Sequence, residues 1–305
     1  MGAEVRAEVT AEIRDAMRDR VGLGWRPELA AGILASLDSI DVIELIADNL
    51  FDSPERARAL RMLSSQTTVV LHGVGLGMAS TLPVDLKRLG KMARLVEFLK
   101  PESWSEHLAF VRAGEIEIGH LAAPPRTRST VEATAENIDT GRKMVGTAPK
   151  MENIATLIDP PVSDLDESEW LKRSVEASGA EMLLDLHNLY ANALNFGLNP
   201  SDFLLRLPLE KVRQVHISGG QFIGDPVSRR LLDDHLHDPP DPVFDLLEEL
   251  AAVCPNPLTV ILERDGSYPP MGLLLAQLEL ARQALQKGRA RERSEVGTVS
   301  GVAVC

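Results

Sequence analysis

The sequence predicts an α/β fold that consists of one (β/α)₈ barrel, and three observations support this prediction. Short apolar runs rich in β-branched residues alternate with longer helical patterns from about residue 20 to about residue 287. Eight strand runs can be counted along this stretch. The chain has 305 residues, and a barrel of this type needs roughly 250. Alternating strands and helices at this length are typical of a parallel barrel.

The predicted strands are apolar through their centres, as expected for parallel strands that are covered on both faces. Charged residues, Pro or Gly flank most of them and mark where each run ends. In chain order the strands are predicted at residues 21–25, 41–46, 67–72, 103–110, 149–154, 181–188, 212–218 and 259–265.

The helical patterns between these strands repeat apolar residues at spacings of three and four. The clearest covers residues 86–99, with the sequence LKRLGKMARLVEFL. Further helices are predicted at residues 131–144, 167–177 and 242–252, and after the last strand at 272–286.

The barrel domain is predicted to cover residues 20–287, with a short segment on each side of it. Residues 1–19 are predicted to form a solvated helical extension, and residues 288–305 a flexible C-terminal tail. Residues 112–130 and 219–240 are predicted to be long loops after the fourth and seventh strands. Barrels carry their active sites on such loops.

Composition excludes several classes of partner. Lys and Arg number 32 against 45 Asp and Glu, so the formal charge is −13. Nucleic acid and anionic membrane are therefore poor partners. No apolar run reaches the length of a membrane span, and the charged start MGAEVRAEVTAEIRDAMRDR is unlike a secretory signal, so we expect a cytoplasmic protein. Only two cysteines are present, which leaves His and carboxylates as the available metal ligands.

Polar side chains stand at the ends of seven predicted strands, where a barrel has its mouth. One histidine at a strand end is more often structural than metal-binding, but seven strands with this feature point to a site. His120 is the one histidine of the seven that we expect at the surface. The polar strand-end residues are Glu44, Asp48, His72, His107, Glu152, Asn153, Asp185, His187, His216 and Glu263.

A second pattern, DDHLHD, lies in the predicted loop after the seventh strand. Asp233, His235 and His237 occupy alternate positions there and would share one face of an extended segment. Imidazole and carboxylate ligands suit iron, manganese or zinc. With the strand-end residues, these side chains exceed what one ion can use, so more than one metal ion is expected.

Other catalytic motifs are absent from the sequence or have the wrong spacing. Gly73, Gly75 and Gly77 lack the spacing of a dinucleotide-binding loop, and no phosphate-binding P-loop, G-x-S-x-G elbow or H-E-x-x-H motif occurs. Two alternatives to a redox enzyme stay open at this point. One is a divalent-metal sugar isomerase or a hydrolase on the same barrel, and the other is a non-catalytic metal-binding scaffold.

The order of the motifs resembles the multinuclear non-heme iron-dependent oxidases, the family that includes the methanobactin biosynthesis oxidase. The resemblance runs from about Gly22 to about Leu285. The motifs that carry it are GLGWRPEL, HGVGLGMAS, SWSEHLAF, MENI, LLDLHNLYANALNFG, VHISGG, DDHLHDPPDPVFDLL and ILERDG.

The resemblance implies a natural-product enzyme that uses O₂ and two or three mixed-valent Fe²⁺/Fe³⁺ ions to modify a residue, most often Cys, of a ribosomally made precursor peptide. A partner protein commonly delivers that peptide. By this resemblance His72 and His107 bind one iron, Glu152 is shared, and Asp185, His216 and Glu263 bind the second. Asp233, His235 and His237, with Asn153 close by, form the third side. Glu152, Asp185 and His187 are the expected catalytic residues.

Three positions depart from the family pattern. His187 replaces an Asn, Ile154 replaces a common Pro, and Gly220 stands where a His often occurs. Because imidazole binds ferrous iron more strongly than an amide does, His187 is expected to strengthen the third metal site. These departures bear on substrate and on the number of metal ions rather than on the fold.

Overall fold

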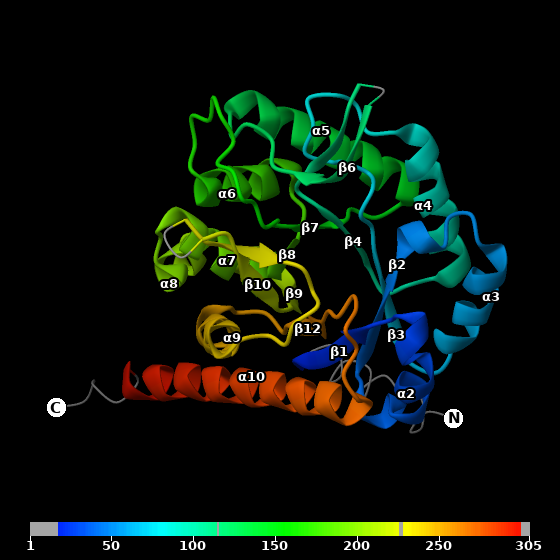
Figure 1. The fold of residues 1–305 in the computed structure, drawn as a ribbon, viewed down its shortest axis with the longest axis vertical. Coiled ribbons are helices and arrows are strands. Elements are labelled where there is room, and N and C mark those ends of the chain that lie inside the picture. Colours follow the sequence, from blue (N-terminus) through cyan, green and yellow to red (C-terminus); the bar gives the residue numbers. More distant parts are fainter. Residues whose placement is uncertain (1–17, 115, 226–227, 300–305) are drawn as a thin grey trace.

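The computed structural model describes residues 18–114, 116–225 and 228–299, and it confirms the predicted barrel. Parallel strands close into one sheet in the order β1-β12-β9-β8-β7-β4-β3-β2, so that β1 pairs with both β2 and β12 (Figure 1). The eight barrel strands are β1 (Arg20–Gly24), β2 (Val42–Ile46), β3 (Thr68–His72), β4 (Trp104–His107), β7 (Lys150–Glu152), β8 (Met182–Asp185), β9 (Val212–Ile217) and β12 (Thr259–Leu262).

Helices surround the barrel, and the main apolar core lies between them and the outward faces of the strands. Sequence-encoded caps fix where several helices begin: Asp85, Thr127 and Asp166 each accept hydrogen bonds from backbone N–H groups of the first helical turn. The helices are α2 (Ala30–Ala35), α3 (Pro54–Leu63), α4 (Leu86–Leu99), α5 (Arg128–Val145), α6 (Glu167–Ser178), α7 (Leu186–Phe196), α8 (Pro200–Leu205), α9 (Asp241–Val253) and α10 (Met271–Val299).

The inside of the barrel is only partly apolar. Val42, Val70 and Ile261 form a small buried cluster that is separate from the main core. Alternate residues of a strand share a face, so Glu44 follows Val42 on the inward side. Lys150 and Gln214 are also buried. A barrel interior is usually filled by branched apolar residues, so these polar groups call for a functional explanation.

Two hairpins replace the loops that we predicted after the fourth and seventh barrel strands. The first pairs β5 (Phe110–Ala113) with β6 (Ile116–Ala122), and the second pairs β10 (Gly220–Ile223) with β11 (Arg230–Asp233). Each hairpin forms a two-stranded sheet of its own. Long segments do follow the fourth and seventh barrel strands, as predicted, but each contains a paired hairpin rather than only loop.

Two predicted element boundaries, the end of the sixth strand and the end of the last helix, also need correction. The strand predicted at 181–188 ends at Asp185, because the Asp185 side chain accepts the backbone N–H of Asn188 and starts α7 directly. At the other end of the chain, α10 continues to Val299, past the flexible tail predicted from residue 288. Arg289 holds this extension, since its guanidinium bonds Asp19 and the Ala251 carbonyl.

The predicted N-terminal helix falls mostly outside the described residues, which begin at Arg18. Arg18 and Asp19 precede β1 without regular structure, and the Asp19 carboxylate accepts the backbone N–H of Leu258. Among the described helices, none has a stretch long and apolar enough to cross a membrane.

Candidate metal centre

The ends of three neighbouring strands bring the first group of ligands together. His72 ends β3, His107 ends β4 and Glu152 ends β7, and all three are buried. Glu152 Oε2 lies 3.4 Å from His72 Nε2 and 3.3 Å from His107 Nε2. On its other side, His72 Nδ1 is hydrogen-bonded to Ser105 Oγ at 2.8 Å, which fixes the ring and leaves Nε2 facing Glu152. One metal ion would fit among these three ligand atoms.

A second group shares Glu152 with the first. Asp185, His216 and Glu263 come from the ends of β8, β9 and β12, and their ligand atoms lie within 4.8 Å of one another and of Glu152. His216 Nδ1 is 3.1 Å from Glu152 Oε1 and 3.1 Å from Glu263 Oε2. The two Glu152 oxygens therefore face different groups, as a carboxylate that bridges two metal ions must.

Asp185 has two separate roles at its two oxygens. Oδ1 accepts the Asn188 backbone N–H at 2.7 Å and caps α7, whereas Oδ2 is buried with no hydrogen-bond partner among the described residues. Burial, with the negative charges of Asp233 and Glu152, raises the pKa of Asp185 well above its ordinary value. A cation beside Oδ2 would remove this penalty.

The predicted third group is arranged differently. Asp233 Oδ1 lies 2.8 Å from His187 Nδ1, and Asp233 Oδ2 lies 2.9 Å from His235 Nε2. His235 Nδ1 in turn lies 3.1 Å from Asp265 Oδ2. These contacts form a chain rather than a compact group, and no set of three ligands around Asp233 converges in the described part of the protein.

The alternation predicted for DDHLHD fails because the segment is not extended. His235 has a φ of 54°, in the left-handed region, and this turns the chain after Asp233. His237 consequently points elsewhere: its side chain is 47% exposed and its Nδ1 lies 2.9 Å from Asp234 Oδ1. The structure thus places Asp233 with His235 and separates both from His237.

Three other predicted residues have clear positions. Both ends of the Asn153 amide are used by the backbone of Asp185, where Nδ2 donates to the carbonyl and Oδ1 accepts the N–H, each at 2.9 Å. His120 is exposed, as expected, and its Nδ1 contacts the Leu121 carbonyl. Asp48 accepts the Val74 backbone N–H and holds the turn after β3.

His187 and Gly220, two of the departures from the family pattern, are physically linked. A Cβ at position 220 would lie 2.7 Å from His187 Cε1 and would overlap the Leu232 carbonyl oxygen. Gly220 therefore leaves the space that the His187 ring fills. His187 Nε2 is buried and has no hydrogen-bond partner among the described residues, so its lone pair is available to a ligand or ion.

Opposite charges in both clusters shift the protonation of their members. Although burial disfavours the imidazolium, Glu152 and Glu106 raise the pKa of His107 to about 9. Burial likewise lowers the pKa of His216, but the negative charges of Glu263 and Glu44 outweigh burial and hold this pKa well above its ordinary value. Burial raises but the neighbouring histidines lower the pKa of Glu152, so that it stays ionised. Without a metal ion, protons on the imidazoles balance the carboxylates.

The donor atoms themselves test whether metal ions fit here. Buried polar atoms are normally hydrogen-bonded, yet several atoms of the cluster residues and their neighbours have no hydrogen-bond partner among the described residues. They include Glu152 Oε2, His107 Nδ1, Asp185 Oδ2, His187 Nε2 and Glu44 Oε1. Imidazole nitrogens and carboxylate oxygens that converge in buried groups are the donor set that first-row transition metals prefer. The residues present therefore fit metal ions.

A cavity of about 1220 Å³ opens above both clusters. His72, His107, Glu152 and Glu263 lie at its base, and the β5–β6 hairpin and the segment 154–161 supply much of its wall. The wall has a strongly apolar part, which includes Val111, Leu121, Ile154, Leu157, Ile158 and Leu231. A substrate in this cavity would reach the metal-binding layer from the mouth of the barrel.

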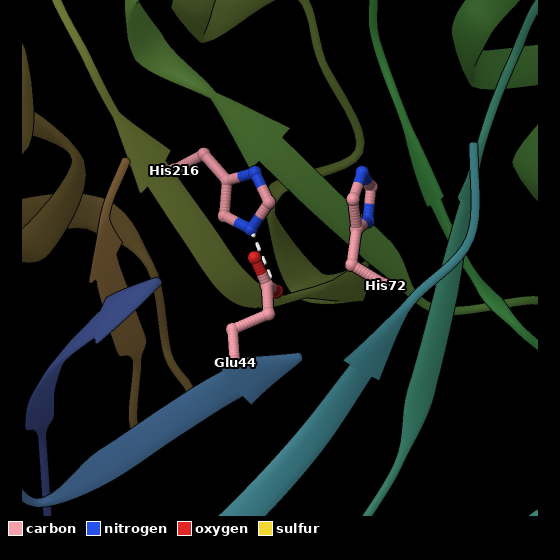
Figure 2. A group of neighbouring side chains, drawn as sticks. All are labelled: Glu44, His72 and His216. Carbon is pink, nitrogen blue, oxygen red and sulfur yellow. Dashed lines mark hydrogen bonds and ion pairs between the residues drawn. The ribbon is translucent and has the colours of Figure 1, made fainter. Parts of the chain in front are cut away.

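Sequence reasoning placed Glu44 at the barrel mouth but did not include it among the ligands. Glu44 Oε2 lies 2.9 Å from His216 Nε2. Ligand atoms of Glu44, His72 and His216 converge as well, in a group distinct from the three described above (Figure 2). The signal was present in the sequence, because an acidic residue in the apolar run Val42–Ile46 requires a buried partner.

Comparison with known families and proteins agrees with this site. Residues 20–286 match the RiPP precursor modification enzymes MbnB/TglH/ChrH, which act on ribosomally synthesised and post-translationally modified peptides. A UPF0276 protein of Streptomyces avermitilis is 36% identical over 88% of this chain, and this chain spans 56% of that relative's length. A UPF0276 protein of Bordetella bronchiseptica is 32% identical, with 89% of this chain and 94% of the relative covered.

Solved structures show the fold alone. An L-ribulose 3-epimerase matches with a TM-score of 0.57 and 15% identity, and the match covers 94% of this chain and 100% of that protein. A xylose isomerase domain protein of Alicyclobacillus acidocaldarius matches with a TM-score of 0.55 and 20% identity, covering 90% of this chain and 99% of that one. Both are similar in architecture to the barrel described above.

Proposed function

The chain belongs to the family of RiPP precursor modification enzymes MbnB/TglH/ChrH, and from this premise we propose that it is a multinuclear iron, O₂-dependent oxidase that modifies a cysteine of a precursor peptide. The observation that carries the proposal is Glu152, whose two oxygens face two separate groups of buried ligands. A single carboxylate between two clusters is the arrangement that two adjacent metal ions need.

The ligand chemistry is compatible with iron. The clusters consist of imidazoles and carboxylates, and the one described cysteine, Cys254, is buried and bonded to the Leu209 carbonyl. Such nitrogen and oxygen sets suit iron and manganese as well as zinc, whereas soft thiolate sites do not arise here. Bound iron would supply the redox chemistry with O₂ and would favour the thiolate form of a cysteine substrate.

The protein's own groups position that chemistry. Ser105 orients His72 through Nδ1, and Asn153 bonds both backbone groups of Asp185, so these ligands are held before any substrate enters. Apolar side chains that include Leu157 and Ile158 line the approach to the clusters. We propose that a third ion is held by Asp233, His235 and His187, with weaker affinity than the other two, because these residues form a chain of contacts and must rearrange before they converge on an ion.

The cavity supports a peptide as the substrate. Pockets for small molecules usually measure about 300–1,000 Å³, and this one is larger, at about 1220 Å³. A short peptide segment with a side chain directed at Glu152 and Glu263 would fill it better than one sugar would. A partner protein that delivers the peptide is part of the same proposal.

The test uses the purified full chain, loaded anaerobically with Fe²⁺, and short cysteine-containing peptides encoded beside its gene. We expect two to three irons per chain and a mass change in one peptide that requires both iron and O₂. Glu152→Ala should abolish the change. Turnover of a sugar without O₂, or one bound zinc and negligible iron, would instead support the isomerase or hydrolase alternative. Metal binding with no turnover of either substrate class would support a scaffold.

A further inference from the structure

The His216 ring lies between carboxylates on opposite sides. Nδ1 is 3.1 Å from Glu152 Oε1 and 3.1 Å from Glu263 Oε2, while Nε2 is 2.9 Å from Glu44 Oε2. Glu44 and His216 are fully buried, so water does not compete for these contacts. A neutral imidazole has one N–H and one lone pair. Only one of the two nitrogens can therefore bind a metal ion while the other donates.

Gln214 decides which nitrogen is free for metal. Its Nε2 donates to Glu44 Oε2 at 2.7 Å and lies 3.4 Å from His216 Nε2, which is a longer contact than the 2.9 Å between His216 Nε2 and Glu44 Oε2; the shorter contact favours an N–H on His216 Nε2 that Glu44 accepts. A metal ion held between Glu44 Oε2 and His216 Nε2 would lie against the amide hydrogens of Gln214, which repel a cation. On the Nδ1 side, by contrast, carboxylate oxygens surround the position where an ion would bind.

The orientation of Gln214 is itself fixed by Lys150. Lys150 Nζ lies 3.4 Å from Gln214 Oε1 and 2.7 Å from Ser103 Oγ. Since an ammonium group can only donate, it selects the amide oxygen and turns the amide nitrogen toward Glu44. Lys150 and Gln214 lie two residues before Glu152 and His216 on β7 and β9, so they form a polar layer directly below the ligands.

We propose that Glu44 is a positioning residue for the metal centre: its carboxylate accepts the Nε2–H of His216, and this leaves His216 Nδ1 to bind the second metal ion. Gln214 and Lys150 hold Glu44 in the orientation that this requires. The proposal rests on the proposed function because it presumes a metal ion between Glu152 and Glu263. It also explains why a barrel interior contains buried Lys, Gln and Glu side chains below its ligands.

The test is an anaerobic Fe²⁺ titration of the parent, Glu44→Ala and Glu44→Gln. In Glu44→Ala we expect the dissociation constant of the second ion to rise by about 10–100-fold, the range found when partners of metal-binding histidines are removed. The first ion, on His72 and His107, should bind as in the parent. Glu44→Gln should show a smaller rise, because its amide oxygen still accepts the Nε2–H.

Glu167→Gln is the matched control for loss of a buried carboxylate. Glu167 is bonded to Arg126 and Asn192, outside the ligand clusters, and this variant should bind both ions as the parent does. Parent-like affinity in Glu44→Ala, or equal weakening of both ions, would refute the positioning role. The titration uses neither O₂ nor peptide, so its outcome is independent of whether the protein proves to be an oxidase.

A crystal structure of the iron-loaded parent tests the same assignment even if Glu44→Ala does not fold. We expect His216 Nδ1 at about 2.0–2.2 Å from iron, with Nε2 still bonded to Glu44. Coordination through His216 Nε2, or by a Glu44 oxygen, would overturn the proposal.

Discussion

Asp185 accepts the backbone N–H of Asn188 with one carboxylate oxygen and presents the other, unpartnered, to the ligand cluster. The same residue thus starts α7 and belongs to the proposed second metal site. These two roles can be separated, because Asn caps helices as well as Asp does but lacks the charge.

Asp185→Asn should therefore lose metal without losing stability. In the metal-free protein we expect its free energy of unfolding to equal or exceed that of the parent, since the buried charge near Asp233 and Glu152 is removed. Asp185→Ala should be less stable by about 0.5–2 kcal/mol, because the cap is lost as well. Urea unfolding and iron analysis measure the two effects. A full iron complement in Asp185→Asn would remove this residue from the ligands.

Glu152→Ala should weaken the binding of both of the first two ions, because each ion loses the Glu152 oxygen that faces its group of ligands. We expect each dissociation constant to rise at least about tenfold, measured by anaerobic Fe²⁺ titration. His120→Ala is the control, since His120 is exposed, is hydrogen-bonded to the neighbouring Leu121 carbonyl and belongs to none of the ligand groups. Loss of one ion alone would show that Glu152 does not bridge.

His187→Asn tests the proposed third site. The variant keeps a polar group but withdraws the imidazole Nε2, so occupancy of the third ion should fall by about tenfold while the other two ions stay. Anomalous scattering at the iron edge, recorded for parent and variant crystals, shows each ion separately. If the parent has His187 Nε2 farther than roughly 2.4 Å from every iron, the residue is not a ligand.

Stability of the metal-free protein should fall with rising pH. The pKa of His107 is raised from 6.5 to about 9 in the fold, so its charged form is favoured more in the folded state than in the unfolded state. This stabilisation is fully present below pH 6.5 and is lost as the pH rises through about 9. Metal affinity should change in the opposite direction, because binding releases these protons. Thermal unfolding and Fe²⁺ titration across pH 6–9 check both trends, and a pH-independent melting temperature in the metal-free protein would contradict the first.

Gly288→Ala should destabilise the protein by about 1–3 kcal/mol, the usual cost of overpacking. A Cβ at this position would overlap the Glu248 carbonyl and lie 2.6 Å from Ala251 Cβ, where α10 packs on α9. Gly272→Ala, in the first turn of the same helix, meets nothing within 4 Å and should be neutral or slightly stabilising. Urea denaturation of both variants tests whether the C-terminal part of α10 is structural.

Most of the barrel and the first two ligand groups were predictable from the sequence. Apolar runs between helical patterns located each strand, and parallel strands bring their C-terminal ends to one mouth. This arrangement brings together His72, His107 and Glu152, independently of the loop conformations.

What the sequence did not predict depends on local backbone geometry. The left-handed φ of His235 separates His237 from Asp233, and the spacing of residues in the sequence does not predict such a backbone conformation. The early start of α7 depended on a side chain, Asp185, that read equally well as a strand end. Glu44 was visible as a polar residue, but its partner His216 lies 172 positions away, beyond the reach of local patterns.

Among the described residues, the β5–β6 and β10–β11 hairpins pair only within themselves and share no ladder with the barrel. Away from Gly220 and Asp233, residues can therefore be inserted, deleted or exchanged in the hairpins at little cost to the closed sheet. The side chains of the first two ligand groups arise at the ends of barrel strands and lie outside both hairpins. Divergence among homologues should consequently alter which molecules are accepted at the mouth faster than it alters the reaction carried out beneath it.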